Sequence, residues 1–127
     1  MEEKVVHKEL SYKIVGIAFD VYNELGSGYQ EKYYQRGFAE GLKKSSLKFN
    51  REVFIPIRFK EESIGRYYLD FLVDSKVIVE LKKGDYFGKK NIEQVNAYLK
   101  ATNLQLAILI NFTSNGVKFM RLLNVKQ

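Results

Sequence analysis

The most apolar stretch of the sequence lies near its C-terminus and constrains the fold more than any other feature. Residues 104–112 read LQLAILINF, a nearly continuous run of aliphatic and aromatic side chains. A strand that is covered on both faces has such a run, because neither face meets water. The stretch therefore predicts a buried strand over residues 104–112 within an α/β protein.

Two helices are expected ahead of the sheet. The first spans residues 10–25, where apolar side chains recur every three or four positions, and it stops at the Gly-Ser-Gly that follows. The second begins near Gln30 and fades in the polar cluster 43–46. Because it contains Gly37 and Gly41, it can pack closely against a neighbour.

Alternating apolar residues and turn-forming clusters divide the rest of the chain into strands and one helix. The expected elements are strands over residues 49–59, 65–73 and 77–82, a helix over residues 88–102, the apolar strand described above, and a last strand over residues 117–123, with turns at 60–63 and 74–76. The predicted fold is therefore α/β: two N-terminal helices, a three-stranded antiparallel meander, a crossover helix and two further strands.

Length and composition bound the class of protein. With 127 residues, 46% of them hydrophobic, the chain is expected to form one domain, residues 1–127, with an apolar core. It has no run of about 18 apolar residues, which argues against a membrane span. Residues 1–4 are unlike the start of a signal peptide. We therefore expect a soluble, cytoplasmic protein.

The residue types also restrict any metal site. The chain has no cysteine and a single histidine, His7, so it can form neither a thiolate zinc site nor a histidine cluster. A metal ion would have to be held by oxygen ligands.

Positive charge is concentrated in the C-terminal part of the chain. The formal net charge is +6; residues 1–75 contain 12 basic and 12 acidic residues, whereas residues 76–127 contain 9 basic and 3 acidic. This imbalance suits a polyanionic partner such as nucleic acid, because Lys and Arg displace counterions from phosphates. Solubility alone is the alternative explanation.

Acidic residues interrupt two apolar strands of the meander. If the turn between them centres on Ser75, Asp70 lies opposite Glu80. The alternation of side chains along a strand then places Lys82 on the same face as Glu80. Like charges that face each other in apolar strands destabilise a sheet unless something compensates for them.

A divalent cation would compensate for the two acids. Mg²⁺ and Mn²⁺ prefer carboxylate and carbonyl oxygens, so Asp70, Glu80 and the main-chain carbonyl of Leu81 are the expected ligands. A metal ion there would activate water and stabilise charge on a phosphate, while Lys82 would position the nucleophile or the phosphate. These features predict phosphodiester hydrolysis. The alternative is a solvated sheet face on which Lys82 only forms a surface ion pair.

Three residues on helices are further candidates. Glu31 shares a helix face with Tyr34 and Phe38, which should point towards the core, so its carboxylate should point inward as well. A favourable interaction with the helix dipole is the alternative explanation. Gln94 and Tyr98 share a face of the last helix, away from its apolar stripe, and can reach the site or a nucleic-acid backbone. The alternative is an ordinary polar flank.

Together these motifs resemble the GxxExxY family, a group of small proteins in the PD-(D/E)XK nuclease superfamily. Gly28, Glu31 and Tyr34 match the naming motif, Asp70 matches the metal-binding aspartate, Glu80-Leu81-Lys82 matches the ExK element, and Gln94 and Tyr98 are similar to the QxxxY motif of the RecB-like branch. The resemblance spans residues 7–124.

The resemblance implies a restriction-endonuclease-like core in which Glu31 joins Asp70 and Glu80 around Mg²⁺ or Mn²⁺. It further implies a catalytic set that comprises Glu31, Asp70, Glu80, Lys82, Gln94 and Tyr98. One departure is Leu69, which stands where the superfamily's name places a proline and which leaves the metal ligands unchanged.

The leading hypothesis is a metal-dependent nuclease that acts on nucleic acid, with DNA as the favoured substrate and RNA as the alternative. The alternative is a catalytically inactive nucleic-acid-binding or protein-interaction module of the same fold, which the 9 tyrosines and 9 phenylalanines would also suit. Lys83, Tyr86, Lys89 and Lys90 are candidate nucleic-acid contacts, Tyr86 by stacking on unpaired bases. A homodimer would suit cleavage of both strands of a duplex.

Overall fold

A mixed five-stranded sheet, with its strands in the order β1-β2-β3-β4-β5, forms the centre of the molecule. The computed structural model describes residues 5–124; residues 1–4, compared above with a signal peptide, and residues 125–127 lie outside that range. The elements are α1 (Lys8–Leu25), α2 (Glu31–Lys44), β1 (Phe49–Phe59), β2 (Glu62–Val73), β3 (Val77–Lys83), α3 (Lys89–Thr102), β4 (Leu106–Phe112) and β5 (Val117–Leu123). Their order and pairing confirm the expected α/β arrangement, with the antiparallel meander and the crossover helix.

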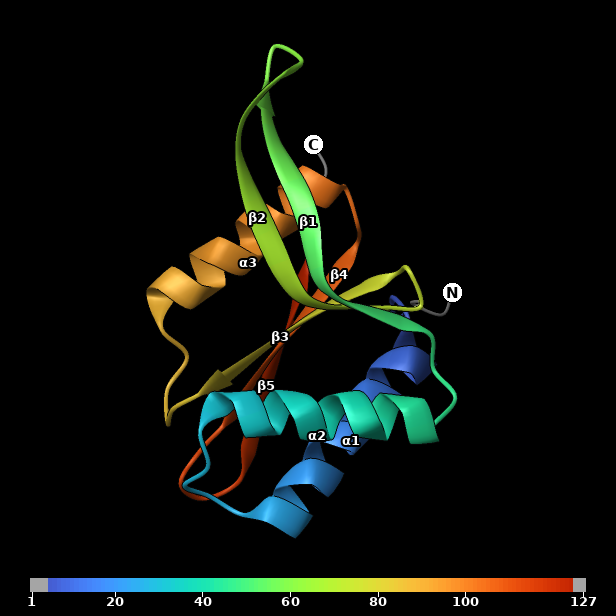
Figure 1. The fold of residues 1–127 in the computed structure, drawn as a ribbon, viewed down its shortest axis with the longest axis vertical. Helices are drawn as coiled ribbons and strands as arrows, with labels where there is room; N and C mark the ends of the chain where they lie inside the picture. Colours follow the sequence, from blue (N-terminus) through green and yellow to red (C-terminus); the bar gives the residue numbers. More distant parts are fainter. Residues whose placement is uncertain (1–4, 125–127) are drawn as a thin grey trace.

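Helices cover both faces of the sheet (Figure 1). α1 and α2 pack on one face, against side chains such as Val79 and Ile108. α3 packs on the other face, against side chains such as Ile78 and Leu109. Every residue of β4 is buried, which confirms the strand covered on both faces. None of the helices within residues 5–124 combines the length and the apolar character needed to cross a membrane.

Two glycines set the distance between α1 and α2. A Cβ atom at Gly41 would lie 2.5 Å from Cγ2 of Ile17, and one at Gly37 would lie 3.1 Å from Cγ1 of Val21. Both distances are shorter than a normal contact between carbon atoms. The close packing expected from these glycines is therefore confirmed, and it fixes the position of α2, which begins at Glu31.

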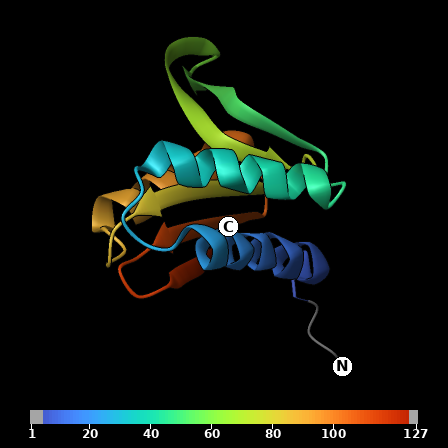
Figure 2. The same ribbon diagram turned by 60° about the horizontal axis from the view of Figure 1, so that its bottom comes forward.

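The β1–β2 hairpin projects beyond the rest of the sheet (Figures 1 and 2). β2 begins at Glu62 rather than at Gly65, because Lys60 and Glu61 alone form the turn. Their φ angles of 48° and 70° are left-handed, as in the two-residue turns that match the twist of a hairpin. Neither residue is a glycine or an asparagine, so the sequence predicts a turn within residues 60–63 but does not indicate its two-residue form.

Two other strand boundaries differ from expectation. β4 begins at Leu106 rather than at Leu104, because α3 ends on the left-handed Asn103, with φ of 58°, and the chain must then turn back into the sheet. The carbonyl of Leu104 accepts a hydrogen bond from the side-chain amide of Asn124 over 3.0 Å. At the other boundary, β3 continues to Lys83, one residue beyond its expected end.

Candidate active site

Asp70 of β2 and Glu80 of β3 lie side by side where these strands separate. The backbone ladder between the strands ends at the pair Phe71–Val79, in the register expected from a turn at Ser75. At the next position, Asp70 and Glu80, hydrogen bonds from the backbone to side-chain carboxylates replace the bonds between the two backbones. The N–H of Asp70 donates to Oε1 of Glu80 over 2.8 Å, and the N–H of Leu81 donates to Oδ2 of Asp70 over 3.0 Å. Each carboxylate is thus held by a backbone donor of the opposite strand.

β2 is strongly twisted at Asp70. Leu69 packs in the core under α3, whereas Phe71 packs in the core under α1 and α2. Side chains two residues apart point to the same face of a regular strand, so the strand must turn between these two positions. Glu52, the residue across from Asp70 on β1, has a left-handed φ of 51°. The irregularity allows the Asp70 carboxylate to reach over to β3.

Burial makes this pair of carboxyl groups hard to ionise. Glu80 is 2% exposed, and desolvation, followed by the charge of Asp70, raises its pKa to about 8. Desolvation also raises the pKa of Asp70, although the hydrogen bond from Leu81 and the charge of Lys82 act in the opposite direction. Near pH 7 the pair therefore keeps a proton unless positive charge is brought to it.

Lys82 lies next to this pair. It is half-buried, and its charge lowers the pKa of both Asp70 and Glu80. Within the part of the chain that the structure describes, Lys82 forms no ion pair. The alternative interpretation, in which these residues lie on a solvated sheet face, is therefore wrong, because Glu80 is buried and Lys82 makes no surface ion pair.

Glu31 approaches the same end of β3 from the other side of the sheet. It is the first residue of α2, and its Oε1 accepts a hydrogen bond from the N–H of Lys83 over 3.2 Å. Its side chain is half-buried, while Tyr34 and Phe38 on the same helix face are buried. The inward direction expected for the Glu31 carboxylate is therefore observed.

The residues around Glu31 hold the start of α2 in place. Gly28 has a left-handed φ of 95° in the loop before the helix. The hydroxyl of Tyr34 donates to the carbonyl of Gly26 over 2.6 Å, and its ring stacks on Phe112 of β4 at 4.4 Å between ring centroids. Gly28 and Tyr34 thus fix the loop that leads to Glu31.

The three carboxylates do not form one cluster. In the range from residue 5 to residue 124, no three acidic or histidine side chains converge closely enough to hold a metal ion. Asp70 and Glu80 are brought together, but the contact of Glu31 is with the backbone of Lys83. The ligand set implied by the family resemblance is therefore present only as a pair plus a third acid at the end of the same strand.

On α3, Tyr98 belongs to the core. It was expected to point away from the stripe of Ile92, Val95 and Leu99, but it is 3% exposed and buried beside Val95 and Leu99. The expectation was wrong because Tyr98 is three positions after Val95, and residues at this spacing share the broad apolar side of a helix.

The hydroxyl of Tyr98 lies within the electrostatic influence of the two acids. Its ring packs edge-on against Tyr67 at 5.0 Å between ring centroids. Desolvation, followed by the charges of Glu80 and Asp70, raises its pKa, so the hydroxyl stays protonated and can donate a hydrogen bond. Gln94, one turn earlier on α3, is exposed.

The candidate nucleic-acid contacts lie on the surface beyond β3. Lys83, Lys89 and Lys90 are exposed, and Tyr86 is 83% exposed. Lys118 of β5 lies over the Tyr86 ring at 5.6 Å from its centroid. These side chains surround the segment that joins β3 to α3, so they lie next to the end of β3 that carries Glu80 and Lys82.

Two residues that the sequence analysis did not select hold this segment. The side-chain amide of Asn111 donates to the carbonyls of Gly84 and Tyr86, over 3.3 and 2.9 Å. Asp85 accepts hydrogen bonds from the N–H and the hydroxyl of Ser114, over 2.8 and 2.9 Å, and both lower its pKa. Asn111 is a buried polar residue within an apolar strand, and that interruption of the pattern was the signal that could have identified it.

Comparisons with solved structures agree with this fold. The crystal structure of SSO0001 is similar with a TM-score of 0.60 and 19% identity; the match covers 96% of this chain and 62% of that one. An alkaline exonuclease (LHK-Exo) from Laribacter hongkongensis is similar with a TM-score of 0.53 and 9% identity, covering 91% and 82%. At these identities the likeness shows the fold alone, and the chain spans less than two thirds of the SSO0001 chain. No curated protein matches the sequence.

The sequence itself gives the family. The model of the PD-(D/E)XK nuclease superfamily matches residues 8–122, a range that contains every element from α1 to β4 and nearly all of β5. The chain belongs to the PD-(D/E)XK nuclease superfamily and has its restriction-endonuclease-like fold.

Proposed function

We propose that the chain is a metal-dependent nuclease that hydrolyses phosphodiester bonds, with DNA as its substrate. The observation that carries the proposal is the buried pair of Asp70 and Glu80, in which burial and mutual repulsion raise the pKa of Glu80 to about 8. Two acids in such a position destabilise the fold when both are ionised, and a divalent cation removes that penalty. The superfamily to which the chain belongs supports the same conclusion.

The proposed ligands of Mg²⁺ or Mn²⁺ are Asp70, Glu80 and the main-chain carbonyl of Leu81, with Glu31 as the third carboxylate. All of these groups offer oxygen atoms, which are the ligands that hard cations prefer. When bound, the metal ion supplies Lewis acidity for water and for the phosphate group. The hydrogen bonds between Asp70 and Glu80 and the backbone of the opposite strand hold the two carboxylates in position.

Other residues act on the phosphate and the nucleophile. The amine of Lys82, close enough to lower the pKa of both acids, would hold the phosphate or orient the attacking water. The hydroxyl of Tyr98 remains protonated beside the acids and would donate a hydrogen bond. Gln94, exposed on α3, would contact the nucleic-acid backbone at the rim of the site.

The surface around the segment between β3 and α3 would bind the substrate. Lys83, Lys89 and Lys90 would contact phosphates, which positions the duplex or single strand without reading its sequence. Tyr86, 83% exposed and held through its carbonyl by Asn111, would stack on an unpaired base.

We further propose that the chain is of the GxxExxY type and that residues 1–127 act as one domain. The residues of the naming motif support the first point, because each contributes to the start of α2. Gly28 forms a left-handed turn, Glu31 places its carboxylate at the end of β3, and Tyr34 donates a hydrogen bond to Gly26. The three residues of the motif would therefore act together to position the Glu31 carboxylate at the site.

A cleavage assay tests the proposal. Labelled single-stranded and duplex DNA and RNA are incubated with the wild type in Mg²⁺, Mn²⁺ or EDTA. We expect cleavage of DNA that EDTA abolishes and that Asp70→Asn or Glu80→Gln reduces about 100-fold or more. Glu40→Gln, an exposed acid on α2, is the matched control and should cleave like the wild type. Binding of DNA without cleavage under all conditions would instead support a noncatalytic binding module.

A further inference from the structure

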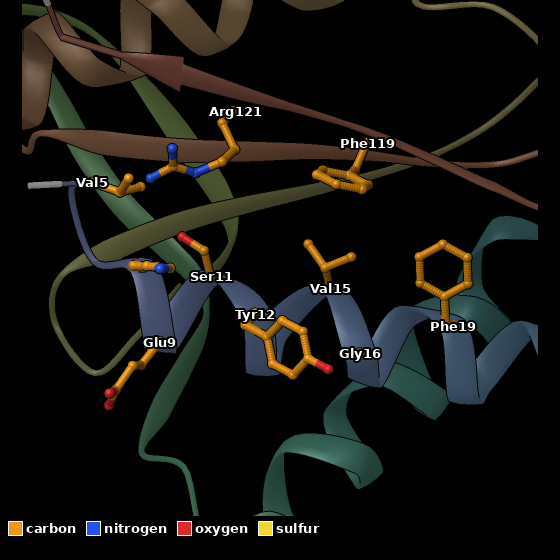
Figure 3. A pocket seen from close by; sticks show the side chains of 10 residues that line it. Val5, Glu9, Ser11, Tyr12, Val15, Gly16, Phe19, Phe119 and Arg121 are labelled. Carbon is orange, nitrogen blue, oxygen red and sulfur yellow. The ribbon is translucent and has the colours of Figure 1, made fainter. Parts of the chain in front are cut away.

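α1 carries aromatic side chains on the side that faces away from the core. Tyr12 and Phe19 are 82% and 41% exposed, and Phe119 on the neighbouring edge strand β5 is 45% exposed. With Val15 they line an open groove of about 600 Å³ between α1 and β5 (Figure 3). Contiguous aromatic surface of this kind is typical of an interface with another protein.

Gly16 lies in the middle of this face. A Cβ atom there would meet nothing within 4 Å, whereas one at Gly41 would collide with Ile17. Packing within the chain therefore does not require a glycine at position 16, and a glycine inside a helix destabilises it. A bare backbone at this point lets a second helix approach closely.

The side chains around Gly16 are arranged so that the face complements itself. Tyr12 and Phe19 lie on the β5 side, while Asp20 lies on the α2 side and Lys13 lies near Leu47, which follows α2. In an antiparallel pair of helices that cross at Gly16, residues whose numbers add up to about 32 lie opposite each other, and each flank meets the same flank of the partner. Lys13 then faces Asp20 of the second copy, and Tyr12 faces Phe19.

The charges of α1 are not explained by the helix itself. Asp20 and Glu24 lie in its C-terminal half, and its last turn has no basic residue, although a helix dipole favours the opposite arrangement. Across the residues that the structure describes, neither Lys13 nor Asp20 forms an ion pair. An antiparallel second copy of α1 provides both charges with a partner.

We propose that this face of α1 forms a homodimer in which two copies of α1 pack antiparallel, with Gly16 at the crossing. A twofold symmetric interface uses the same patch on both subunits, so the patch must complement itself. The pairs Lys13–Asp20 and Tyr12–Phe19 meet that condition, each formed twice. The inference does not depend on the nuclease activity.

Light scattering after size exclusion provides the first test. The wild-type chain of 127 residues should have about twice the 14.8 kDa mass of one chain. Lys13→Asp and Asp20→Lys should each raise the dissociation constant of the dimer at least about tenfold, because they place like charges opposite each other. The double variant Lys13→Asp/Asp20→Lys should restore the dimer, since it exchanges the two signs.

Cross-linking then tests the register, because the chain has no cysteine of its own. Lys13→Cys and Asp20→Cys are prepared separately and mixed under oxidising conditions. A disulfide between the two different variants is expected. Neither variant should cross-link with itself, because positions 13 and 20 each lie about 9 Å or more along the helix axis from the same position in the second copy.

The outcomes separate this interface from others. A wild type that stays monomeric at the highest concentration reached overturns the proposal, whatever else α1 binds. A dissociation constant that is unchanged in both single charge variants, or a disulfide of Lys13→Cys with itself, overturns it as well, because either result requires a different contact. All substituted positions are exposed, and equal circular dichroism spectra and melting curves verify that the variants are folded.

Discussion

Burial of Glu80 in the fold favours its protonated form, whereas the proposed metal site requires its ionised carboxylate. Its pKa of about 8 lies above the value of 4.5 for an exposed glutamate. Between these two values the folded protein keeps a proton that the unfolded chain has released. The folded state therefore binds more protons, and the free energy of unfolding must fall as pH rises through this range.

The melting temperature in EDTA should accordingly fall, by about 5 °C or more, as the pH is raised from near 4.5 to above 8. In the Glu80→Gln variant this position cannot ionise, so the melting temperature should depend less on pH. Mg²⁺ at the alkaline end should raise the melting temperature of the wild type and leave that of the variant unchanged. Scanning calorimetry at several pH values measures this, and a wild-type melting temperature that rises with pH would contradict it.

The pairing of Asp70 with Glu80 could be predicted from the sequence, because the position of the turn between β2 and β3 determines which residues lie opposite each other. Once Ser75 is at the centre of the turn, the register of β2 and β3 is fixed, and Phe71–Val79 is indeed a pair. The burial of Tyr98 was not predicted, because the width of the buried side of α3 depends on the sheet on which it packs. Asn111 interrupts an apolar run and could have been noticed, but its role could not be predicted, because its bonds to Gly84 and Tyr86 join segments far apart in sequence.

Among the elements, α2 has the most direct effect on the site, because its first residue is Glu31. Tyr34→Phe keeps the stack on Phe112 but removes the hydrogen bond to Gly26. We expect a loss of about 1 kcal/mol of stability and weaker metal-dependent cleavage, because the loop before Glu31 is no longer fixed.

Tyr33→Phe is the matched control for this change. Tyr33 is the neighbouring residue, is 41% exposed, and its hydroxyl makes no hydrogen bond within residues 5–124. Chemical denaturation and the cleavage assay should show it equal to the wild type. Equal effects of the two substitutions would mean that the bond to Gly26 does not position α2.

The contact between α1 and α2 makes a second prediction at this scale. Gly41→Ala places a methyl group 2.5 Å from Cγ2 of Ile17, so we expect a loss of about 1–3 kcal/mol in the free energy of unfolding. Ile17→Leu removes that Cγ2 atom and keeps the volume of the side chain. The double variant should therefore be less destabilised than the sum of the two single variants, as urea denaturation can determine.

Element type was predictable and element boundaries were less so, for physical reasons. The apolar run of β4 and the periodicity of the helices depend only on which faces are buried. The start of β2 depends on a turn in which Lys60 and Glu61 adopt left-handed φ angles, which most residues avoid. The start of β4 depends on Asn124, whose amide bonds to Leu104 and Leu99 and lies far along the chain.

For the whole molecule, the position of the positive charge, rather than its total, should determine affinity for nucleic acid. Exchanging Lys83, Lys89 and Lys90 for Gln should weaken DNA binding and reduce the slope of log affinity against log salt by about 2–3. A matched triple exchange of Lys43, Lys44 and Lys48, exposed at and beyond the other end of α2, should leave both almost unchanged. Fluorescence anisotropy at several salt concentrations measures the slopes, and equal losses in the two variants would mean that binding depends on net charge alone.

The central claim is that Asp70 and Glu80 form a site for a divalent cation. Isothermal titration of the wild type with Mg²⁺ and Mn²⁺ near neutral pH, in buffers that differ in ionisation enthalpy, tests it most directly. The account predicts binding with the release of a proton, because the pKa of Glu80 is about 8 without the metal, and loss of binding in Asp70→Asn and Glu80→Gln. Absence of binding in the wild type, or equal binding in both variants, would contradict it.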